Sequence, residues 1–145
     1  MTPSAAPPAT TAPVPPHPYA GNGAAVAVEQ EIFDAYGCEC PLDDPVFLAG
    51  ALERAVLSVH ATVVDRVVHH FVPHGVTVVL VLAESHAVLS TWPEHGYANV
   101  AIFLCNPEMP PARVWAKLRT ELRPAHTVVH LLRHEIGPAP AAAAA

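Results

Sequence analysis

The fold of this chain is decided by the stretch VTVVLVLAESHAVLSTW, residues 76–92. Residues 76–85 form a continuous apolar run of strand length that is rich in β-branched side chains, which is typical of a central buried strand. Residues 86–92 stay extended and stop at Pro93, which cannot donate a ladder hydrogen bond. We therefore expect two strands of a buried sheet here.

The segments on either side predict four more strands and two helices. Apolar residues alternate with polar ones in the strand segments and recur every three or four residues in the helical ones. The expected strands are 28–36, 61–72, 97–105 and 126–134, and the expected helices are 47–61 and 111–122. This order predicts an α+β fold, a two-layer α/β sandwich in which an antiparallel sheet carries helices on one face. The other sheet face would stay uncovered, which favours a dimer.

Composition limits the folded part to one domain. Residues 1–25 and 138–145 are rich in Pro and Ala and lack the large apolar side chains that offset the entropy of ordering a chain, so we expect both to be disordered. Residues 26–137 remain for one small hydrophobic core, and a domain of that size often completes its burial by dimerising.

Charge, hydropathy and cysteine content argue against several classes of protein. A net charge of −6 gives no basic surface for nucleic acid. The N-terminus lacks the pattern of a secretory signal, and no apolar run reaches the roughly 18 residues of a membrane helix. Three cysteines without a pairing pattern predict reduced thiols in a cytoplasmic protein.

The ten histidines do not form a metal-binding pattern. His69 and His70 are adjacent in an expected strand, so their side chains point to opposite faces. His130 and His134 are four residues apart in another strand, about 13 Å from each other, which is too far to share a metal ion. We therefore expect no metal site.

Reactive side chains gather in residues 84–105, but their spacing alone does not define an enzyme. Ser85 lacks the G-x-S-x-G pattern of a nucleophile elbow, and no carboxylate beside His86 or His95 completes a catalytic triad. From the residue types alone, this segment can equally consist of strand and turn residues, with Cys105 as a buried thiol.

The motifs of this region resemble the bacterial S-adenosylmethionine decarboxylase proenzymes, the small pyruvoyl-dependent type. The resemblance rests on ESH at 84–86, on TWPEHGYA at 91–98 and on a cysteine seven residues later. It continues upstream through HHFVPHGVTVVLVLA at 69–83 and FDAYGCECPLDDPVFLAGALERAV at 33–56. It covers roughly residues 28–135 and leaves out the Pro/Ala-rich ends.

This resemblance implies that the chain makes its own cofactor. The Ser85 hydroxyl would attack the Glu84 carbonyl to form an ester, and β-elimination would then break the chain into residues 1–84 and 85–145. The new terminus would lose ammonia and become a pyruvoyl group, which forms a Schiff base with S-adenosylmethionine and accepts electrons as CO2 leaves. The product supplies spermidine biosynthesis. The resemblance also implies a homodimer of processed αβ units with their sheets packed face to face.

Three more site residues follow from the resemblance. Cys105 occupies the position of the proton donor that completes the decarboxylation. Phe71 matches an aromatic residue that stacks on adenine, and Glu94 matches the carboxylate that holds the ribose hydroxyls. Without the resemblance, Phe71 would be a core residue and Glu94 a solvated turn charge.

The chain departs from the family where self-cleavage and substrate binding are concerned. Ser90 stands in place of a processing histidine, and Thr77 stands where the family usually has a processing serine. A hydroxyl is a poor base compared with an imidazole, which His86 or His95 could supply instead. Ala101 replaces an acidic residue that is a candidate substrate contact.

These departures leave two alternatives open. The same pyruvoyl chemistry could act on another amino acid, ornithine or arginine, which Ala101 and Ser90 favour. The chain could also be a non-processing, non-catalytic homologue that acts as a partner subunit, which the absent histidine favours.

Overall fold

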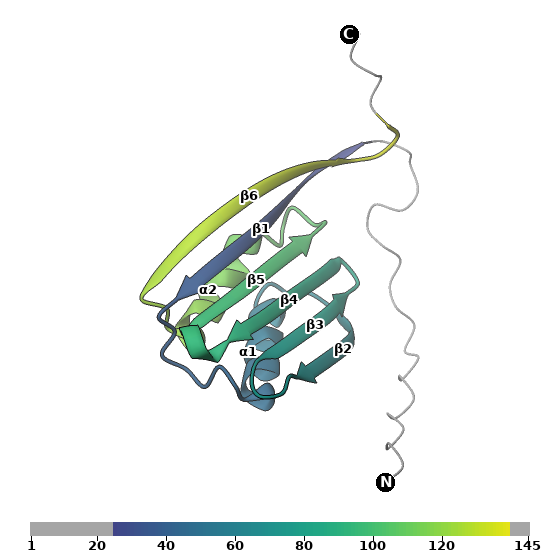
Figure 1. The fold of residues 1–145 in the computed structure, drawn as a ribbon. Helices are drawn as coiled ribbons and strands as arrows, with labels where there is room; N and C mark the ends of the chain where they lie inside the picture. Colours follow the sequence, from purple (N-terminus) through teal and green to yellow (C-terminus); the bar gives the residue numbers. More distant parts are fainter. Residues whose placement is uncertain (1–24, 140–145) are drawn as a thin grey trace.

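The computed structural model describes residues 25–139, so the Pro/Ala-rich ends expected to be disordered lie outside it except for residues 25, 138 and 139. The described part consists of two helices, one short 3-10 helix and six strands (Figure 1). In chain order these are β1 (Val26–Tyr36), α1 (Pro45–Leu57), β2 (Val63–His70), β3 (Val76–Leu82), β4 (Ser85–Trp92), η1 (Pro93–His95), β5 (Tyr97–Leu104), α2 (Pro111–Leu122) and β6 (His126–Ile136).

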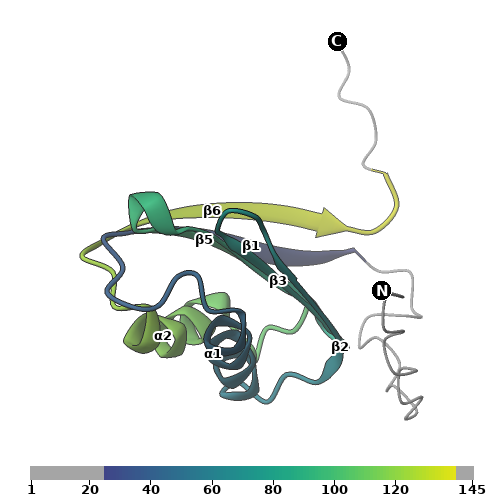
Figure 2. The same ribbon diagram turned by 60° about the horizontal axis from the view of Figure 1, so that its bottom comes forward.

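The six strands form one antiparallel sheet in the order β2-β3-β4-β5-β1-β6. Both helices lie against the same face of this sheet (Figure 2). The predicted α+β class and the single helical layer are therefore confirmed. The sequence did not predict the strand order, which places β1 between β5 and β6 although β1 begins the folded chain.

The hydrophobic core lies between the sheet and the helices. Alternate strand residues point toward the helices, among them Val78 and Leu80 of β3 and Ile102 of β5, all fully buried. Leu52 of α1 and Leu118 of α2 meet them from the other side. The ring of Phe33 on β1 stacks on that of Trp115 on α2, with centroids 4.6 Å apart and planes at 10°. This stack joins α2 to the sheet.

Helix α2 has the predicted bounds, whereas α1 is displaced from its predicted range of 47–61. It begins at Pro45 because the Asp44 carboxylate caps it, accepting hydrogen bonds from the Val46 and Phe47 amides at 3.0 Å each. It ends at Leu57, earlier than expected, and His60 then adopts a left-handed φ of 64° on the way to β2. Within residues 25–139, neither helix has the length and hydropathy needed to cross a bilayer.

The continuous run 76–85 is not one strand. Strand β3 ends at Leu82, the chain reverses over Ala83 and Glu84, and β4 starts at Ser85, which pairs with Leu82. The sequence pattern placed the boundary between these strands at 85/86, because the turn at Ala83 and Glu84 contains none of the usual turn residues Gly, Pro, Asn or Asp. Position 85, the expected cleavage site, therefore directly follows a tight hairpin turn.

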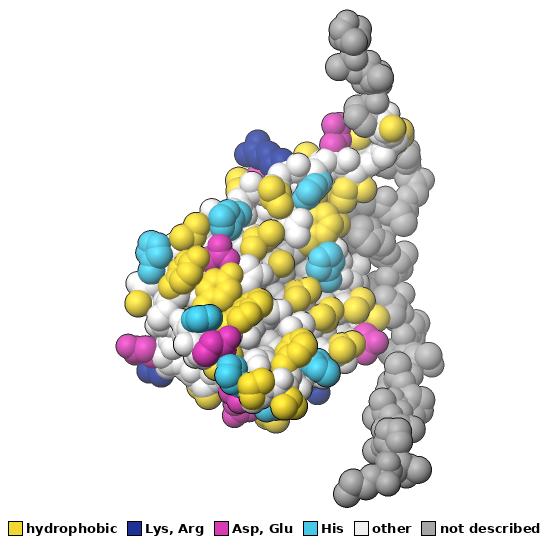
Figure 3. Space-filling view, in the orientation of Figure 1, with side chains coloured by type: hydrophobic (Ala, Val, Ile, Leu, Met, Phe, Trp, Pro, Cys, Tyr) yellow, Lys and Arg dark blue, Asp and Glu magenta, His cyan; other side chains and the backbone are white. Residues whose placement is uncertain are grey.

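The sheet face opposite the helices is uncovered, as predicted. Cross-strand pairing aligns its residues in rows, and the central row is apolar, with Val79, Val88, Ala101 and Ile32. Hydrophobic and histidine side chains are spread over this face (Figure 3). We call it the open face below.

Truncation of Phe33 should test how the helical layer is held. Phe33→Ala should lower the free energy of unfolding by about 3–5 kcal/mol, because it removes a fully buried ring and leaves a cavity against Trp115. Urea denaturation at fixed chain concentration measures this change. Val46→Ala, at a position 82% exposed, is the matched control and should stay within about 0.5 kcal/mol of the parent. A loss below about 1 kcal/mol for Phe33→Ala would contradict the assigned packing.

Candidate active site

Ser85 has a strained backbone. Its φ is 143°, in the region that residues with a side chain rarely adopt, and such conformations cost about 1–3 kcal/mol. Strain of this kind persists only when neighbouring contacts hold the backbone in place. The backbone at Ser85 therefore differs from that of the other strand residues within 25–139, none of which has a positive φ.

Two contacts from distant segments hold that peptide bond. The Cys105 backbone N–H donates to the Glu84 carbonyl oxygen at 2.9 Å, which would also stabilise negative charge developing on that oxygen. The buried Glu84 carboxylate accepts hydrogen bonds from the Thr62 backbone N–H at 3.1 and 3.3 Å. The sequence did not predict the part played by Thr62, because a backbone donor leaves no trace in residue type.

The Ser85 hydroxyl touches two other candidate residues. Its Oγ lies 3.1 Å from Nδ1 of His86, and it also forms a hydrogen bond with the Cys105 side chain. Cys105 is 4% exposed. Burial raises the pKa of its thiol, and the hydrogen bond with Ser85 opposes this to a smaller extent. Cys105 therefore remains a protonated thiol at neutral pH, as a proton donor must.

A cavity of about 320 Å³ opens beside Cys105. Asn106, Pro107 and the first residues of β1 line it, and so does Arg133 of β6, whose guanidinium lies 3.4 Å from the Glu29 carboxylate. Cys105 thus lines a space that also contains one positive and one negative side chain.

The other predicted site residues lie around a second cavity, of about 370 Å³. Its lining includes Phe71, Thr77, Ser90 and Glu94, four residues assigned by family resemblance. The hydroxyl oxygens of Thr77 and Ser90 lie 2.9 Å apart across the β3–β4 ladder. Phe71 is 48% exposed, so it is not the core residue that its strand position would suggest by default.

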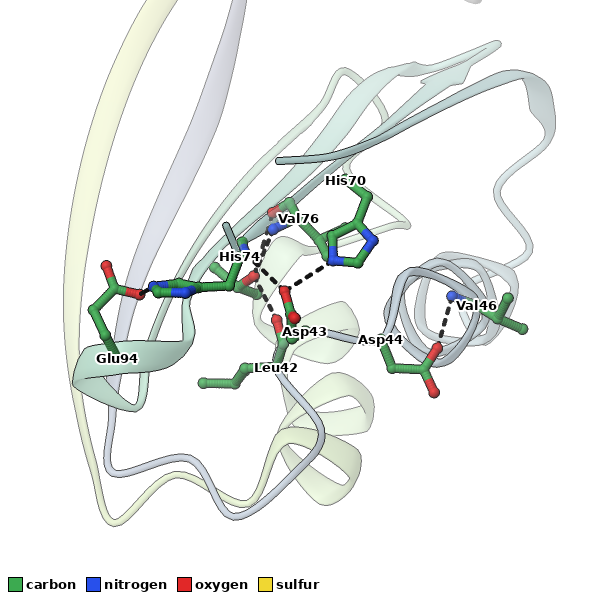
Figure 4. A network of polar contacts seen from close by, with 10 residues as sticks. Leu42, Asp43, Asp44, Val46, His70, His74, Val76 and Glu94 are labelled. Atoms are coloured by element: carbon green, nitrogen blue, oxygen red, sulfur yellow. Dashed lines mark hydrogen bonds and ion pairs between the residues drawn. The ribbon is translucent and has the colours of Figure 1, made fainter. Parts of the chain in front are cut away.

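Glu94 is not a free surface charge. One of its carboxylate oxygens lies 2.8 Å from Nε2 of His74, which belongs to the loop between β2 and β3 (Figure 4). That loop is held by Asp43, whose Oδ1 accepts from the Gly75 backbone N–H at 2.8 Å and lies 2.9 Å from Nε2 of His70. Asp43 is therefore a loop anchor, and Asp44 alone caps the helix.

The hydrogen bond from Gly75 lowers the pKa of Asp43, and His70 adds to the effect. His74 and Asp43 were absent from the predicted site because their partners are distant in the sequence.

The structure does not bring all predicted site residues together within one chain. Ser90 is five residues from Ser85 along β4, which in an extended strand is about 17 Å. Ser85, Glu84 and Cys105 form one group at the turn between β3 and β4, and Phe71, Thr77, Ser90 and Glu94 form the other at the opposite ends of these strands. Within a single chain Thr77 and Ser90 therefore lie far from Ser85, and a part for them in its cleavage stays a prediction.

The carboxylate of Asp34 lies on the same row of the open face as Thr77 and Ser90 and has three polar partners. Asp34 accepts hydrogen bonds from Tyr97 Oη at 2.6 Å and Asn99 Nδ2 at 2.9 Å, and it lies 2.7 Å from His130 Nε2. The hydrogen bond from Tyr97 is the largest cause that lowers the pKa of Asp34. Among residues 25–139, no three His, Cys, Asp or Glu side chains gather closely enough to hold a metal ion.

Comparison with known proteins places this geometry in a family. The sequence model of the S-adenosylmethionine decarboxylase family matches residues 29–135. The S-adenosylmethionine decarboxylase proenzyme of Parasynechococcus marenigrum is 40% identical over 105 residues, covering 72% of this chain and 82% of that protein. The proenzyme of Thermotoga maritima is 33% identical over 107 residues, covering 73% and 81%.

A solved structure supports the same family assignment. The crystal structure of adenosylmethionine decarboxylase from Aquifex aeolicus is similar with a TM-score of 0.65 and 31% identity, covering 81% of this chain and 97% of that one. The chain belongs to the S-adenosylmethionine decarboxylase family.

The protonation of Cys105 can be tested by alkylation of the uncleaved chain. Because burial raises the pKa of this thiol, its thiolate fraction at pH 7.5 should be below that of an ordinary cysteine, and its labelling rate should keep rising above pH 9. We expect iodoacetamide to modify Cys105 at least about 10-fold more slowly in the folded chain than in urea. Peptide mass spectrometry measures both rates, and equal rates would contradict the burial described here.

Proposed function

We propose that this chain is the proenzyme of a pyruvoyl-dependent decarboxylase that acts on S-adenosylmethionine and supplies spermidine biosynthesis. The observation that carries the proposal is the strained Ser85 peptide, whose carbonyl accepts a hydrogen bond from Cys105. Family membership supports the same activity, since the relatives are named as proenzymes of this decarboxylase. The three free thiols support a cytoplasmic location.

Self-cleavage between Glu84 and Ser85 is supported by the turn geometry. Attack of the Ser85 hydroxyl on the Glu84 carbonyl would relieve the strain at φ 143°, and the Cys105 N–H would hold the resulting oxyanion. The Glu84 side chain, held by Thr62, keeps the carbonyl in place during the attack.

The residues around Ser85 suit a pyruvoyl group at that position. Such a group supplies a carbonyl that acts as an electron sink for decarboxylation. Cys105 would hold a proton at Sγ next to this position and deliver it to the substrate carbon, a role that its raised pKa supports. Its burial limits access of water, which would otherwise compete as a proton source.

The second cavity suits the nucleoside part of the substrate. The exposed ring of Phe71 offers a face for adenine, and Glu94 retains one carboxylate oxygen that can accept from a ribose hydroxyl while His74 engages the other. A single-chain site would need these groups beside Ser85, and they lie near the far end of β4.

A second copy of the chain would bring the Ser85 group of one chain near the Phe71 and Glu94 group of the other. The two groups lie at opposite ends of β4, and the open face presents an apolar row between these ends, so two open faces related by a twofold axis can bring Ser85 and Cys105 of one chain toward Phe71 and Glu94 of the other. We therefore propose a homodimer of αβ units, packed sheet to sheet, in which each active site needs both chains. The uncovered apolar surface supports this assembly.

Ala101 favours a second candidate substrate. Its register places it between Val88 and Ile32 in the apolar row, so it offers no carboxylate to the cationic part of S-adenosylmethionine. Decarboxylation of ornithine or arginine by the same pyruvoyl chemistry is therefore the alternative. CO2 release from the three compounds, assayed in parallel, separates them.

Self-cleavage can be followed by intact mass. We expect the 15.3 kDa chain to yield two fragments, with the C-terminal one starting at residue 85 and blocked to Edman degradation, because the serine amine is lost. Ser85→Ala should abolish cleavage, since it removes the attacking hydroxyl. A single 15.3 kDa species after long incubation would instead support the non-catalytic homologue that acts as a partner subunit.

Shared active sites predict complementation between two inactive variants. Ser85→Ala lacks the cleavage residue and Glu94→Ala lacks the ribose carboxylate, so each alone should lose most decarboxylation. Co-expression with random mixing should restore about a quarter of the sites, because half the dimers are mixed and each mixed dimer has one intact site. If the mixture stays as inactive as its components, the site does not draw on both chains.

A further inference from the structure

We infer that His86 is the base that starts self-cleavage in this chain, a role that rests on the proposed function and extends it. The family's processing histidine is replaced by Ser90, whose hydroxyl lies 2.9 Å from that of Thr77. The imidazole that touches the reacting hydroxyl is instead that of His86, with Nδ1 at 3.1 Å from Ser85 Oγ.

This contact is unusual for neighbouring strand residues. Successive side chains of a strand point to opposite faces, so residues i and i+1 do not normally meet. The φ of 143° at Ser85 breaks this alternation at the first residue of β4 and lets its hydroxyl approach the next side chain. The strained backbone therefore sets the nucleophile against a base.

The surroundings of His86 orient its ring. Its cross-strand neighbours on the open face are Val81 and Phe103, and the Phe103 ring meets the imidazole edge-on at 5.6 Å and 62°. Phe103 in turn meets His134, whose Nε2 lies 3.1 Å from Gln30 Oε1. A neutral ring with its proton on Nε2 presents Nδ1 as an acceptor toward the Ser85 hydroxyl.

The step balances without a co-reactant. Nδ1 of His86 takes the Ser85 hydroxyl proton as Oγ bonds to the Glu84 carbonyl carbon, and the oxyanion forms against the Cys105 N–H. The carbon–nitrogen bond of the peptide then breaks, and the imidazolium returns the proton to the Ser85 nitrogen. The result is an ester between Glu84 and Ser85 with a free amine.

The test measures the cleavage rate and the species that accumulates. His86→Asn keeps a hydrogen-bond acceptor near the Nδ1 position but cannot take the proton, so cleavage should slow by at least about 100-fold. The uncleaved chain should be an ordinary peptide that hydroxylamine does not cut. In His86→Ala, added imidazole should recover part of the rate. His126→Gln, on the open face at the start of β6, is the matched control and should cleave at the parent rate.

The outcomes separate this inference from the proposed function. A parent chain that never cleaves overturns both. A parent chain that cleaves, with His86→Asn and His86→Ala each cleaving at the same rate, overturns the role of His86 alone. Accumulation of a hydroxylamine-sensitive ester in either variant also overturns it, because the histidine would then act in elimination. Thermal unfolding of each variant checks that the fold is retained.

Discussion

The backbone of Ser85, held at a φ of 143° by a two-residue turn, is the constraint on which the chemistry of this protein depends. Three separate segments keep it there. The Cys105 amide binds the carbonyl of the preceding residue, the Thr62 amide binds its carboxylate, and the β3–β4 ladder fixes the strands on both sides. Because these contacts come from the residue after β5, from the segment before β2 and from the hairpin itself, the strain can exist only after the sheet has formed.

A sheet with helices on one side accounts for the second feature, the division of the site. The helical layer buries one face, with the stack of Phe33 on Trp115 joining α2 to β1. The site then has a reactive end at Ser85 and a binding end at Phe71 and Glu94, which line a cavity with Ser90, about 17 Å from Ser85 along β4. Neither end is a complete active site, so the fold makes self-association a condition of function in the proposed mechanism.

The departures from the family fit their local surroundings. Ser90 and Thr77 lie within hydrogen-bond distance of each other, so the polar groups at the former histidine position are satisfied. Ala101 extends an apolar row between Val88 and Ile32, where a carboxylate would need a partner. Both replacements thus leave no unpaired polar group at their positions on the open face. In the mechanism inferred above, His86 is then the base beside the nucleophile.

The sequence by itself determined the α+β class, the bounds of α2 and the single helical layer. These depend on local periodicity and on short motifs, which a chain carries before it folds. It placed the boundary between β3 and β4 at 85/86 rather than at Ala83 and Glu84, because this turn lacks the Gly, Pro, Asn or Asp that usually marks one. Only the tertiary structure decided the strand order, the φ of Ser85, its contact with His86 and the separation of the two groups of site residues. Each of these depends on which strands pair and on how a distant backbone amide restrains a turn, and such long-range contacts leave no periodic signal in the sequence.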